Sequence, residues 1–322
     1  MTNATTLWMG LNAPHLSPAE LHVGVLGVPY DGSVSHRAGA AAAPAVLREL
    51  SRHTRPHTEN LVSLRGLRLR DFGDVPVDLD DAGATQQAIA QAVQPIVAAG
   101  AVPMVLGGDH SITSGVLAAF SACDNLGILW LDSHPDLMDS YRGPHGKAES
   151  RWNHACPLRR ICELPNVRPE NVLIVGLRDY IEEEIAFVRE QRIEVLYARD
   201  LGRLTPQDVV EQIGRKFAHV PAVYLSCDID ILDPACAPGT GVPVPGGIST
   251  RYLYDIVFAL FDQEREAQRT AGRHFLRLAG FDLVEIAPPL DVDDRTSHAG
   301  MGLLTALLGY AALQAGLPDL EL

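Results

Sequence analysis

The sequence predicts an α/β domain whose mostly parallel central sheet is covered by helices on both faces. Short apolar runs typical of buried strands alternate with stretches of helical periodicity along nearly the whole chain. No linker, internal repeat or break in composition divides the 322 residues. Several apolar runs end in Asp or His, and the carboxyl ends of parallel strands share the sheet edge at which ligands bind. We therefore expect a single domain over residues 1–322.

The first half of the chain predicts strands and helices in turn, after an irregular lead-in over residues 1–20. Pro44 suits the first turn of a helix that continues through Leu50, and residues 84–99 have helical periodicity. Residues 51–80 are less regular. The strands of this half are expected at 22–28, 67–71, 101–106 and 126–130, and its last helix at 112–122.

The second half begins with a long polar loop over residues 137–153, which lacks periodicity. A loop of that length inside a compact domain is usually functional or disordered. After it the alternation resumes. Strands are expected at 171–176, 193–197, 222–228 and 275–281, and helices at 157–163, 180–191, 205–217, 249–264 and 297–315.

Composition excludes several classes of partner. The formal net charge is −14, which argues against nucleic acid or an anionic membrane, because phosphate groups are bound by basic patches. No apolar run has the length of about 18 residues that a membrane span needs, and the first residues lack the features of a signal peptide. The five cysteines form no C-x-x-C pair, which is typical of reduced thiols. We expect a soluble, cytoplasmic protein.

Ligand-type side chains follow the buried strand predicted at 126–130. Asp132, His134 and Asp136 alternate, so in an extended segment all of them project to one side. Burying unpaired carboxylates costs several kcal/mol or more, and a bound cation is the usual remedy. Taken alone, this triplet is also compatible with solvated charges where a strand ends.

Two further strands deliver the same residue types. The run at 223–227 leads to Asp228, Asp230 and Asp233, and the run at 105–106 leads through two glycines to Asp109 and His110. Since these strand ends are expected at one edge of the sheet, the sequence predicts a metal cluster there. We expect Asp109 to orient its neighbours and Asp233 to be structural.

These motifs resemble those of the ureohydrolase superfamily, the group of arginases, agmatinases and formimidoylglutamases. The resemblance covers about residues 22–312 and implies a three-layer α/β/α sandwich, two Mn²⁺ ions per subunit and a homo-oligomer, commonly a trimer or hexamer. The motifs stand in the following order: GGDHS at 107–111, DSHPD at 132–136, SCDIDILDP at 226–234, APGTG at 237–241, PGG at 245–247 and DLVEIAP at 282–288.

The resemblance also implies the ligands of both ions. One ion would be held by His110, Asp132, Asp136 and Asp228, and the other by Asp132, His134, Asp228 and Asp230. Two divalent ions that share a hydroxide would suit attack on the planar carbon of a guanidinium or formimino group. Oxygen-rich ligands fit manganese better than zinc.

Two residues outside the ligand set are candidates for catalysis and substrate binding. Glu285 would anchor the substrate cation, although an acid at a strand end can also be solvated or paired in a salt bridge. His154 matches the histidine that arginases and agmatinases carry after the long loop, and would act as general acid and proton shuttle. The alternative interpretation is that His154 is a loop histidine without a role.

The sequence leaves the substrate open. The loop offers cations suited to a substrate carboxylate, namely Arg142, Lys147 and Arg151, and Arg151 is the candidate substrate contact. It also offers anions suited to a substrate amine, namely Asp139 and Glu149. His154 with residues 157–160 and 237–241 resembles agmatinases, whereas residues 35–39, 176–180 and 294–298 resemble formimidoylglutamases. Val242 stands where agmatinases usually have threonine.

We expect a small-molecule substrate and rank agmatine, hydrolysed to urea and putrescine, first. Formimidoylglutamase activity, which converts N-formimidoyl-glutamate to glutamate and formamide, is the alternative. Guanidinobutyrase and arginase activities follow. A metal-binding protein without turnover is the alternative of a different class, and the complete ligand set together with His154 and Glu285 argues against it.

Overall fold

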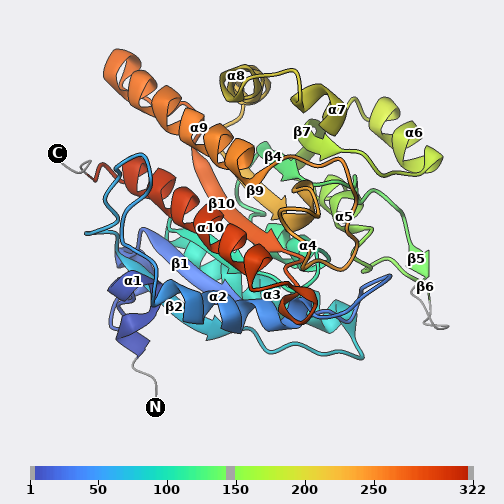
Figure 1. The fold of residues 1–322 in the computed structure, drawn as a ribbon, viewed down its shortest axis with the longest axis horizontal. Coiled ribbons are helices and arrows are strands. Elements are labelled where there is room, and N and C mark those ends of the chain that lie inside the picture. Colours follow the sequence, from blue (N-terminus) through green and yellow to red (C-terminus); the bar gives the residue numbers. More distant parts are fainter. Residues whose placement is uncertain (1–3, 143–148, 318–322) are drawn as a thin grey trace.

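The computed structural model describes residues 4–142 and 149–317, and at its centre lies a parallel sheet of 8 strands (Figure 1). The strand order is β2-β1-β3-β10-β9-β4-β7-β8, and every neighbouring pair is parallel. The strands are β1 (Val23–Gly27), β2 (Leu69–Asp74), β3 (Val102–Leu106), β4 (Leu126–Leu131), β7 (Val167–Leu177), β8 (Glu194–Tyr197), β9 (Val223–Asp228) and β10 (Leu278–Val284).

Helices cover both faces of this sheet. The helices are α1 (Leu7–Gly10), α2 (Ala43–Ser51), α3 (Ala82–Ala98), α4 (Ile112–Ala118), α5 (Pro157–Cys162), α6 (Glu182–Glu190), α7 (Ala198–Leu201), α8 (Pro206–Phe217), α9 (Thr250–Ala271) and α10 (Arg295–Gln314). Apolar side chains of α2, α8, α9 and α10 belong to one buried cluster, and those of α3, α4, α5 and α6 belong to another. The predicted three-layer α/β/α sandwich is confirmed.

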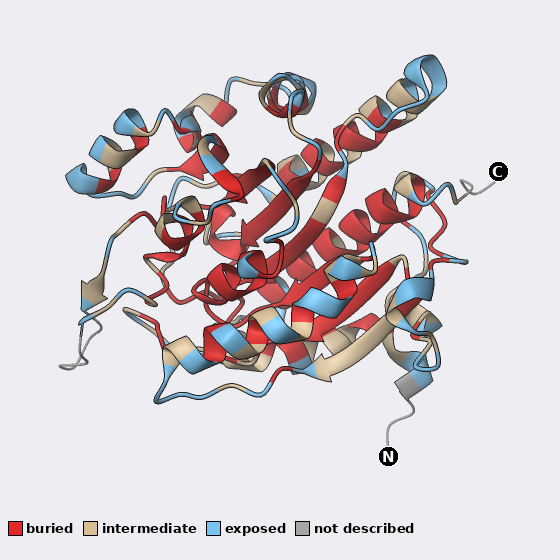
Figure 2. Cartoon of the chain, turned by 180° about the vertical axis from the view of Figure 1, so that it is seen from behind, coloured by how far each residue is buried: buried red, intermediate tan, exposed pale blue. Residues whose placement is uncertain are grey.

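The two buried clusters arise from alternation along each strand. In β3, Met104 and Leu106 face the first cluster and Val105 faces the second. In β4, Leu129 faces the first cluster and Trp130 faces the second. Because successive side chains point to opposite faces, a strand that is apolar at every position is covered on both sides. The central strands are accordingly buried along their length (Figure 2).

The predicted strands and helices occur in the predicted order, with shifts at their ends. The last strand begins at Leu278 rather than at residue 275, because the preceding chain is tied elsewhere: the Phe275 amide donates to Glu264 Oε2 (2.8 Å). Helix α9 continues to Ala271, where Gly272 adopts a left-handed conformation (φ 59°) and ends it. Strand β7 starts earlier than predicted and α4 ends earlier.

The described part of the N-terminal lead-in, residues 4–20, contains the short helix α1 and two 3₁₀ turns, and it is also part of the core. Trp8 is fully buried although its φ of 53° lies outside the helical range. Its backbone amide donates to Ser51 Oγ (2.8 Å) and its indole Nε1 donates to Asp71 Oδ2 (2.8 Å). A single buried tryptophan shows no periodicity, so the pattern of the sequence does not reveal it.

The long polar loop contains two short strands that periodicity does not predict. Strands β5 (Tyr141–Arg142) and β6 (Glu149–Ser150) pair in antiparallel fashion. Residues 143–148, which include the candidate cation Lys147, lie outside the described residues.

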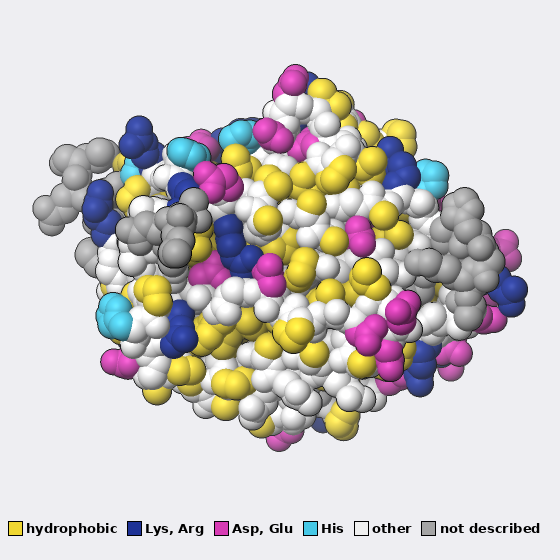
Figure 3. Space-filling view, turned by 90° about the horizontal axis from the view of Figure 1, so that it is seen from below, with side chains coloured by type: hydrophobic (Ala, Val, Ile, Leu, Met, Phe, Trp, Pro, Cys, Tyr) yellow, Lys and Arg dark blue, Asp and Glu magenta, His cyan; other side chains and the backbone are white. Residues whose placement is uncertain are grey.

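Surface charge is mixed over the face of the molecule seen from below, where acidic and basic side chains lie among apolar ones (Figure 3). Among the described residues, no helix combines the length and the apolar character that crossing a membrane requires.

The strand order determines where the site forms. Strands β3, β10, β9 and β4 are consecutive at the middle of the sheet, and each continues into one of the motifs predicted to carry chemistry. The turn η5 (Ile229–Ile231) follows β9 directly. Parallel pairing places all these carboxyl ends at one edge of the sheet. Segments far apart in sequence therefore meet there: His110 and Glu285 are 175 residues apart and are joined by a hydrogen bond.

Candidate active site

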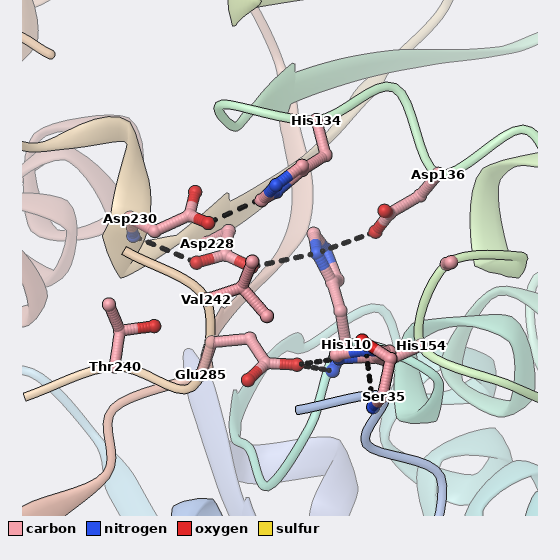
Figure 4. A pocket seen from close by; sticks show the side chains of 11 residues that line it. Ser35, His110, His134, Asp136, His154, Asp228, Asp230, Thr240, Val242 and Glu285 are labelled. Carbon is pink, nitrogen blue, oxygen red and sulfur yellow. Dashed lines mark hydrogen bonds and ion pairs between the residues drawn. The ribbon is translucent and has the colours of Figure 1, made fainter. Parts of the chain in front are cut away.

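Three carboxylates surround one nitrogen of His110. His110 Nδ1 lies 3.0 Å from Asp132 Oδ2, 3.2 Å from Asp136 Oδ2 and 3.4 Å from Asp228 Oδ2. All four side chains are buried. Ligand atoms about 3 Å apart are what neighbouring positions around a divalent ion with bonds of about 2.1 Å require. Figure 4 shows His110, Asp136 and Asp228 directed at this common point.

A second group shares Asp132 with the first. His134 Nδ1 lies 3.1 Å from Asp230 Oδ2 and 3.5 Å from Asp132 Oδ1. Ligand-type atoms of His110, Asp132 and Asp228, and separately those of Asp132, His134 and Asp230, lie within 4.8 Å of one another. The structure thus brings together all six residues that the sequence predicts as metal ligands.

The hydrogen bonds of His110 show that this arrangement fits a cation. The Ser226 hydroxyl donates to Asp282 Oδ1 (2.6 Å), so its oxygen accepts from His110 Nε2–H (2.8 Å). With its proton on Nε2, the neutral imidazole presents a lone pair at Nδ1 to three carboxylates. Within the described chain, His110 Nδ1 and Asp132 Oδ2 are buried without a hydrogen-bond partner. Lone pairs that converge in this way require a positive charge between them.

Without a cation, protons must balance the carboxylates. Burial opposes a charged imidazole, but the carboxylates of Asp132, Asp136 and Asp228 close to Nδ1 outweigh it, because each could accept from a protonated Nδ1, and they raise the pKa of His110 well above 6.5. Burial and the charge of Asp132 raise the pKa of Asp136 to about 6. Burial opposes ionisation of Asp132 as well, but His110 and His134 hold its pKa below the ordinary value. Bound metal would replace these protons.

The surroundings of His110 fix its orientation. The Trp130 ring stacks on the His110 ring with centroids 4.1 Å apart and planes 1° apart. Asp282 is fully buried in the middle of β10 and accepts hydrogen bonds from Thr113 Oγ1 and Tyr224 OH at Oδ2, in addition to the bond from Ser226. Partners of this kind hold a metal-binding histidine in one tautomer and one orientation.

Glu285 and His154 lie side by side below this centre (Figure 4). Glu285 Oε1 accepts hydrogen bonds from the His110 backbone amide (3.0 Å) and from His154 Nδ1 (2.9 Å). His154 Nε2 in turn accepts from the Ser35 backbone amide (2.8 Å). Burial opposes its protonation, but the carboxylate of Glu285 raises the pKa of His154.

The backbone of Glu285 is strained. Its φ of 61° is uncommon for a residue other than glycine and costs of the order of 1 kcal/mol. The Glu285 amide donates to Gly108 O (2.9 Å), which holds it in place. Strain of this kind is typical of functional sites, and here it turns the carboxylate into the pocket.

The pocket is a small cavity of about 70 Å³ that opens onto these groups. Its wall opposite His154 is the segment 240–242, which forms an isolated antiparallel bridge with Ile286 through Thr240. The Thr240 hydroxyl is buried and has no hydrogen-bond partner within the described chain. The lining residues are Ser35, His110, His134, Asp136, His154, Ala155, Asp228, Asp230, Thr240, Val242 and Glu285.

Other predicted residues lie elsewhere. Arg151, the candidate substrate contact, is half exposed, pairs with Glu163 Oε2 (2.7 Å) and is absent from the described pocket lining. Asp109 accepts hydrogen bonds from the Ser33 amide and from Ser111, so it orders the loops around the site. Burial and the charge of Glu285 raise its pKa to about 7. Asp233 accepts from the Ala235 and Gly246 amides, which is a structural role.

Four contributors were not predicted: Ser35, Ser226, Thr240 and Asp282. Of these, Asp282 gave a usable signal, because an acid in the middle of an apolar strand is rarely buried without partners. Ser226 occupies the position in β9 just before the ligand motif, where a small polar residue is unremarkable. Ser35 and Thr240 lie in loops, whose conformation periodicity does not predict.

Comparisons with known proteins agree with this geometry. The sequence pattern of the arginase family matches residues 21–309. A guanidinopropionase from Pseudomonas aeruginosa is 32% identical, over 92% of this chain and 89% of the relative. An agmatinase from Bacillus anthracis is 32% identical, over 91% and 93%. The crystal structure of a hypothetical agmatinase from Burkholderia thailandensis superposes with a TM-score of 0.81 at 26% identity, covering 98% of this chain and 93% of that one.

Proposed function

This chain belongs to the arginase family, whose members hydrolyse C–N bonds of guanidino compounds, and from that premise we propose that it is a dinuclear-manganese agmatinase. The observation that carries the proposal is the bare Nδ1 of His110 facing three buried carboxylates beside Glu285. A metal-bound centre next to a carboxylate oxygen that has no hydrogen-bond partner within the described chain suits hydrolysis of a cationic, planar group.

The residues that would hold the ions are those brought together at the strand ends. His110, Asp132, Asp136 and Asp228 would bind one Mn²⁺, and Asp132, His134, Asp228 and Asp230 the other. Their oxygen-rich composition favours manganese over zinc. When bound, such ions act as Lewis acids that lower the pKa of water and orient it for attack.

Glu285 and Thr240 would hold the guanidinium group. Glu285 uses Oε1 for two protein hydrogen bonds, whereas Oε2 and the Thr240 hydroxyl have none within the described chain. Both oxygens can accept from guanidinium N–H groups. A carboxylate in a buried pocket binds such a cation more strongly than it would in water.

His154 would supply the proton that the leaving amine needs. Glu285 raises the pKa of His154 and so favours the charged imidazolium, which presents Nδ1–H to Glu285 and can donate from Nε2 to Ser35 Oγ (2.6 Å). A substrate held by Glu285 therefore lies next to this proton. Transfer of the Nδ1 proton to the departing nitrogen leaves a neutral imidazole, and the raised pKa favours its reprotonation.

Two observations favour an amine on the substrate's distal end. Of the loop cations that the sequence offers for a substrate carboxylate, Arg151 is engaged by Glu163, and the arginines of the formimidoylglutamase-like motifs, Arg37 and Arg178, are engaged by backbone carbonyls. Asp179, whose side chain is 59% exposed, lies 3.6 Å from His134 Nε2 at the pocket and offers a negative charge. Agmatine carries an amine at this end.

A guanidino carboxylic acid is the second candidate. It is supported by the 32% identity to a guanidinopropionase. N-formimidoyl-glutamate is supported by the sequence motifs around Arg37 and Arg178, and the bonds of these arginines to the backbone weaken that support.

Turnover by the Mn²⁺-loaded protein tests the proposal. Agmatine, guanidinopropionate and guanidinobutyrate would be assayed for urea, and N-formimidoyl-glutamate for formamide, at equal concentrations. We expect urea from agmatine with the highest kcat/KM. A higher value for guanidinopropionate would replace agmatine by the second candidate, and formamide without urea would contradict both.

Glu285→Gln tests the substrate anchor. The amide keeps the shape and one acceptor oxygen but removes the charge that balances the guanidinium, so we expect kcat/KM to fall by about a thousandfold or more. Two ions should remain bound, as measured by elemental analysis. Loss of the ions together with activity would mean that Glu285 supports the metal centre instead.

The cytoplasmic location and the trimeric or hexameric state remain part of the proposal. Size-exclusion chromatography with light scattering tests the oligomeric state, and a monomer at micromolar concentration would contradict it.

A further inference from the structure

Arg178 follows β7 and makes an unusual set of hydrogen bonds. Its half-buried guanidinium donates only to backbone carbonyls, and no carboxylate pairs with it among the described residues. Nε and Nη2 both donate to Val244 O (3.1 and 2.8 Å), and Nη2 also donates to Asp230 O (2.5 Å). The remaining acceptors are Gly176 O, Ile231 O and Leu232 O.

These bonds join three segments that meet at the site. One is the end of β7, the second is the turn η5 with Asp230, and the third is the loop after the pocket wall. The segments approach so closely that a Cβ on Gly176 (φ 104°) would lie 2.7 Å from Ile231 Cγ1 and 2.9 Å from Asp132 O. The carbonyl of Asp230 is thus held directly by Arg178.

The side chain of Asp230 is held from the other direction. Its Oδ1 accepts from the Ser133 amide (3.1 Å), and its Oδ2 faces His134 Nδ1 at 3.1 Å. No hydrogen bond of Arg178 reaches His110 or Asp136. Removing the guanidinium would therefore release the group formed by His134 and Asp230, and leave the group around His110 in place.

The guanidinium of Arg178 also keeps its positive charge beside these carboxylates. Burial lowers the pKa of Arg178, but an arginine stays protonated at all ordinary pH values, and the nearby carboxylates of Asp230, Asp132 and Asp228 favour its charged form. No N–H group of Arg178 is left for a substrate carboxylate, because the guanidinium has only five and six contacts use them.

We propose that Arg178 is a positioning residue for the ion of the His134–Asp230 group, and that it does not bind substrate. This inference rests on the dinuclear site of the proposed function. According to this proposal, a side chain that is not itself a ligand determines how tightly one of the two ions binds.

Titration of the metal-free protein with Mn²⁺ tests it, by calorimetry for affinity and by electron paramagnetic resonance for coupled ion pairs. In wild type we expect two ions and a coupled signal. In Arg178→Met we expect one ion with near wild-type affinity, a second bound at least tenfold more weakly, and loss of the coupled signal at low Mn²⁺. Arg178→Lys keeps a charge without the planar fork, and should fall between the two.

Arg37→Met is the matched control. Arg37 also donates to carbonyls of the pocket-wall loop, at Thr240 O (2.8 Å) and Gly241 O (3.2 Å), but it bonds to no ligand-bearing turn. We expect this variant to bind both ions as wild type does. Loss of the second ion in Arg37→Met as well would mean that any loosening of this loop has the effect, and would overturn the specific role of Arg178.

Each of several other results would also contradict the proposal. Wild-type affinities for both ions in Arg178→Met, or equal weakening of both, would contradict it, as would normal metal binding with a raised KM for guanidinopropionate. If Arg178→Met fails to fold, Arg178→Lys decides by the same criteria. Fewer than two ions in wild type would instead contradict the proposed function.

Discussion

Ser226 decides which nitrogen of His110 faces the carboxylates. Its hydroxyl donates to Asp282 and therefore can only accept from His110 Nε2. If the hydroxyl were absent, either tautomer could form, and the one with its proton on Nδ1 cannot bind metal through that atom. The buried Asp282 acts on the site through this hydroxyl.

Ser226→Ala is therefore expected to weaken Mn²⁺ binding by about 10- to 100-fold, the range typical when a partner of a ligating histidine is lost. Calorimetric titration measures the change. Ser51→Ala serves as control, because Ser51 is an equally buried serine that bonds to Trp8 and does not line the pocket. Unchanged affinity in Ser226→Ala would show that the tautomer of His110 is set by other means.

Thr240 offers a second test at the scale of one side chain. A buried hydroxyl without a partner costs about 1–3 kcal/mol, and a bound guanidinium would satisfy it. Thr240→Val has the same shape and no hydroxyl. We expect the KM of agmatine to rise about tenfold, while the free protein becomes slightly more stable to heat.

Thr240→Ser keeps the hydroxyl and should retain a KM near that of wild type. Steady-state kinetics and thermal unfolding of both variants make the comparison. A KM in Thr240→Val equal to that in Thr240→Ser would rule out the substrate contact.

Individual site residues differ in how well the sequence predicts them. Asp132, His134 and Asp136 are predictable because alternation at a strand end carries them to one side, and the structure places them together. The position of Arg151 was not predictable, because its partner Glu163 lies at the far end of α5, and the sequence does not reveal how the loop packs on that helix. Arg178 stood out in a motif, but its hydrogen bonds to carbonyls depend entirely on tertiary structure.

Among elements, the N-terminal segment has more influence on stability than its irregular sequence suggests. Trp8 fills a space between α2 and β2 and satisfies both of its N–H groups with Ser51 and Asp71. Trp8→Ala would leave a cavity and remove the indole hydrogen bond to Asp71, so we expect a loss of about 3–5 kcal/mol in the free energy of unfolding.

Denaturant unfolding measures this loss, and Leu79→Ala is the control. Leu79 is also large and apolar but 64% exposed, so its truncation should change stability by less than about 0.5 kcal/mol. Equal effects of the two substitutions would mean that the segment around Trp8 detaches before the core unfolds.

Element boundaries were less predictable than element types. Apolar alternation identifies β3, β4 and β9 because both of their faces are covered. It misplaces the start of β10, because side chains of two helices hold the apolar residues before it: Tyr310 and Gln314 of α10 donate to Leu276 O, and Glu264 of α9 accepts from the Phe275 amide. The strands β5 and β6 are too short for a period to show.

For the whole molecule, the metal centre links stability to pH. The folded-state pKa values of His110 and His134 lie above 6.5, so their contribution to stability is complete below about pH 6.5 and is lost as pH rises through those values. Asp136, raised to about 6, acts in the same direction at lower pH. The metal-free protein should therefore become less stable as pH rises above neutrality.

Mn²⁺ should have the opposite dependence. Its binding displaces these protons, so apparent affinity should rise by about tenfold per pH unit for each proton displaced. We expect the increase in Tm caused by Mn²⁺ to be larger at pH 8 than at pH 6. Differential scanning fluorimetry at fixed Mn²⁺ measures it. An increase that is independent of pH would show that the ligands are already deprotonated before the metal binds.

The position of β10 has a consequence for how the chain reaches this state. Strand β10 is the last strand in sequence, yet it lies between β3 and β9 in the sheet. During synthesis on the ribosome, the β1–β3 portion and the β4–β9 portion can form only as separate half-sheets until residues 278–284 emerge. His110 belongs to the first portion, and the aspartates belong to the second. A nascent or truncated chain that lacks β10 would thus be unable to assemble the ion site that includes His110, which makes completion of the two-ion centre a late event in biogenesis.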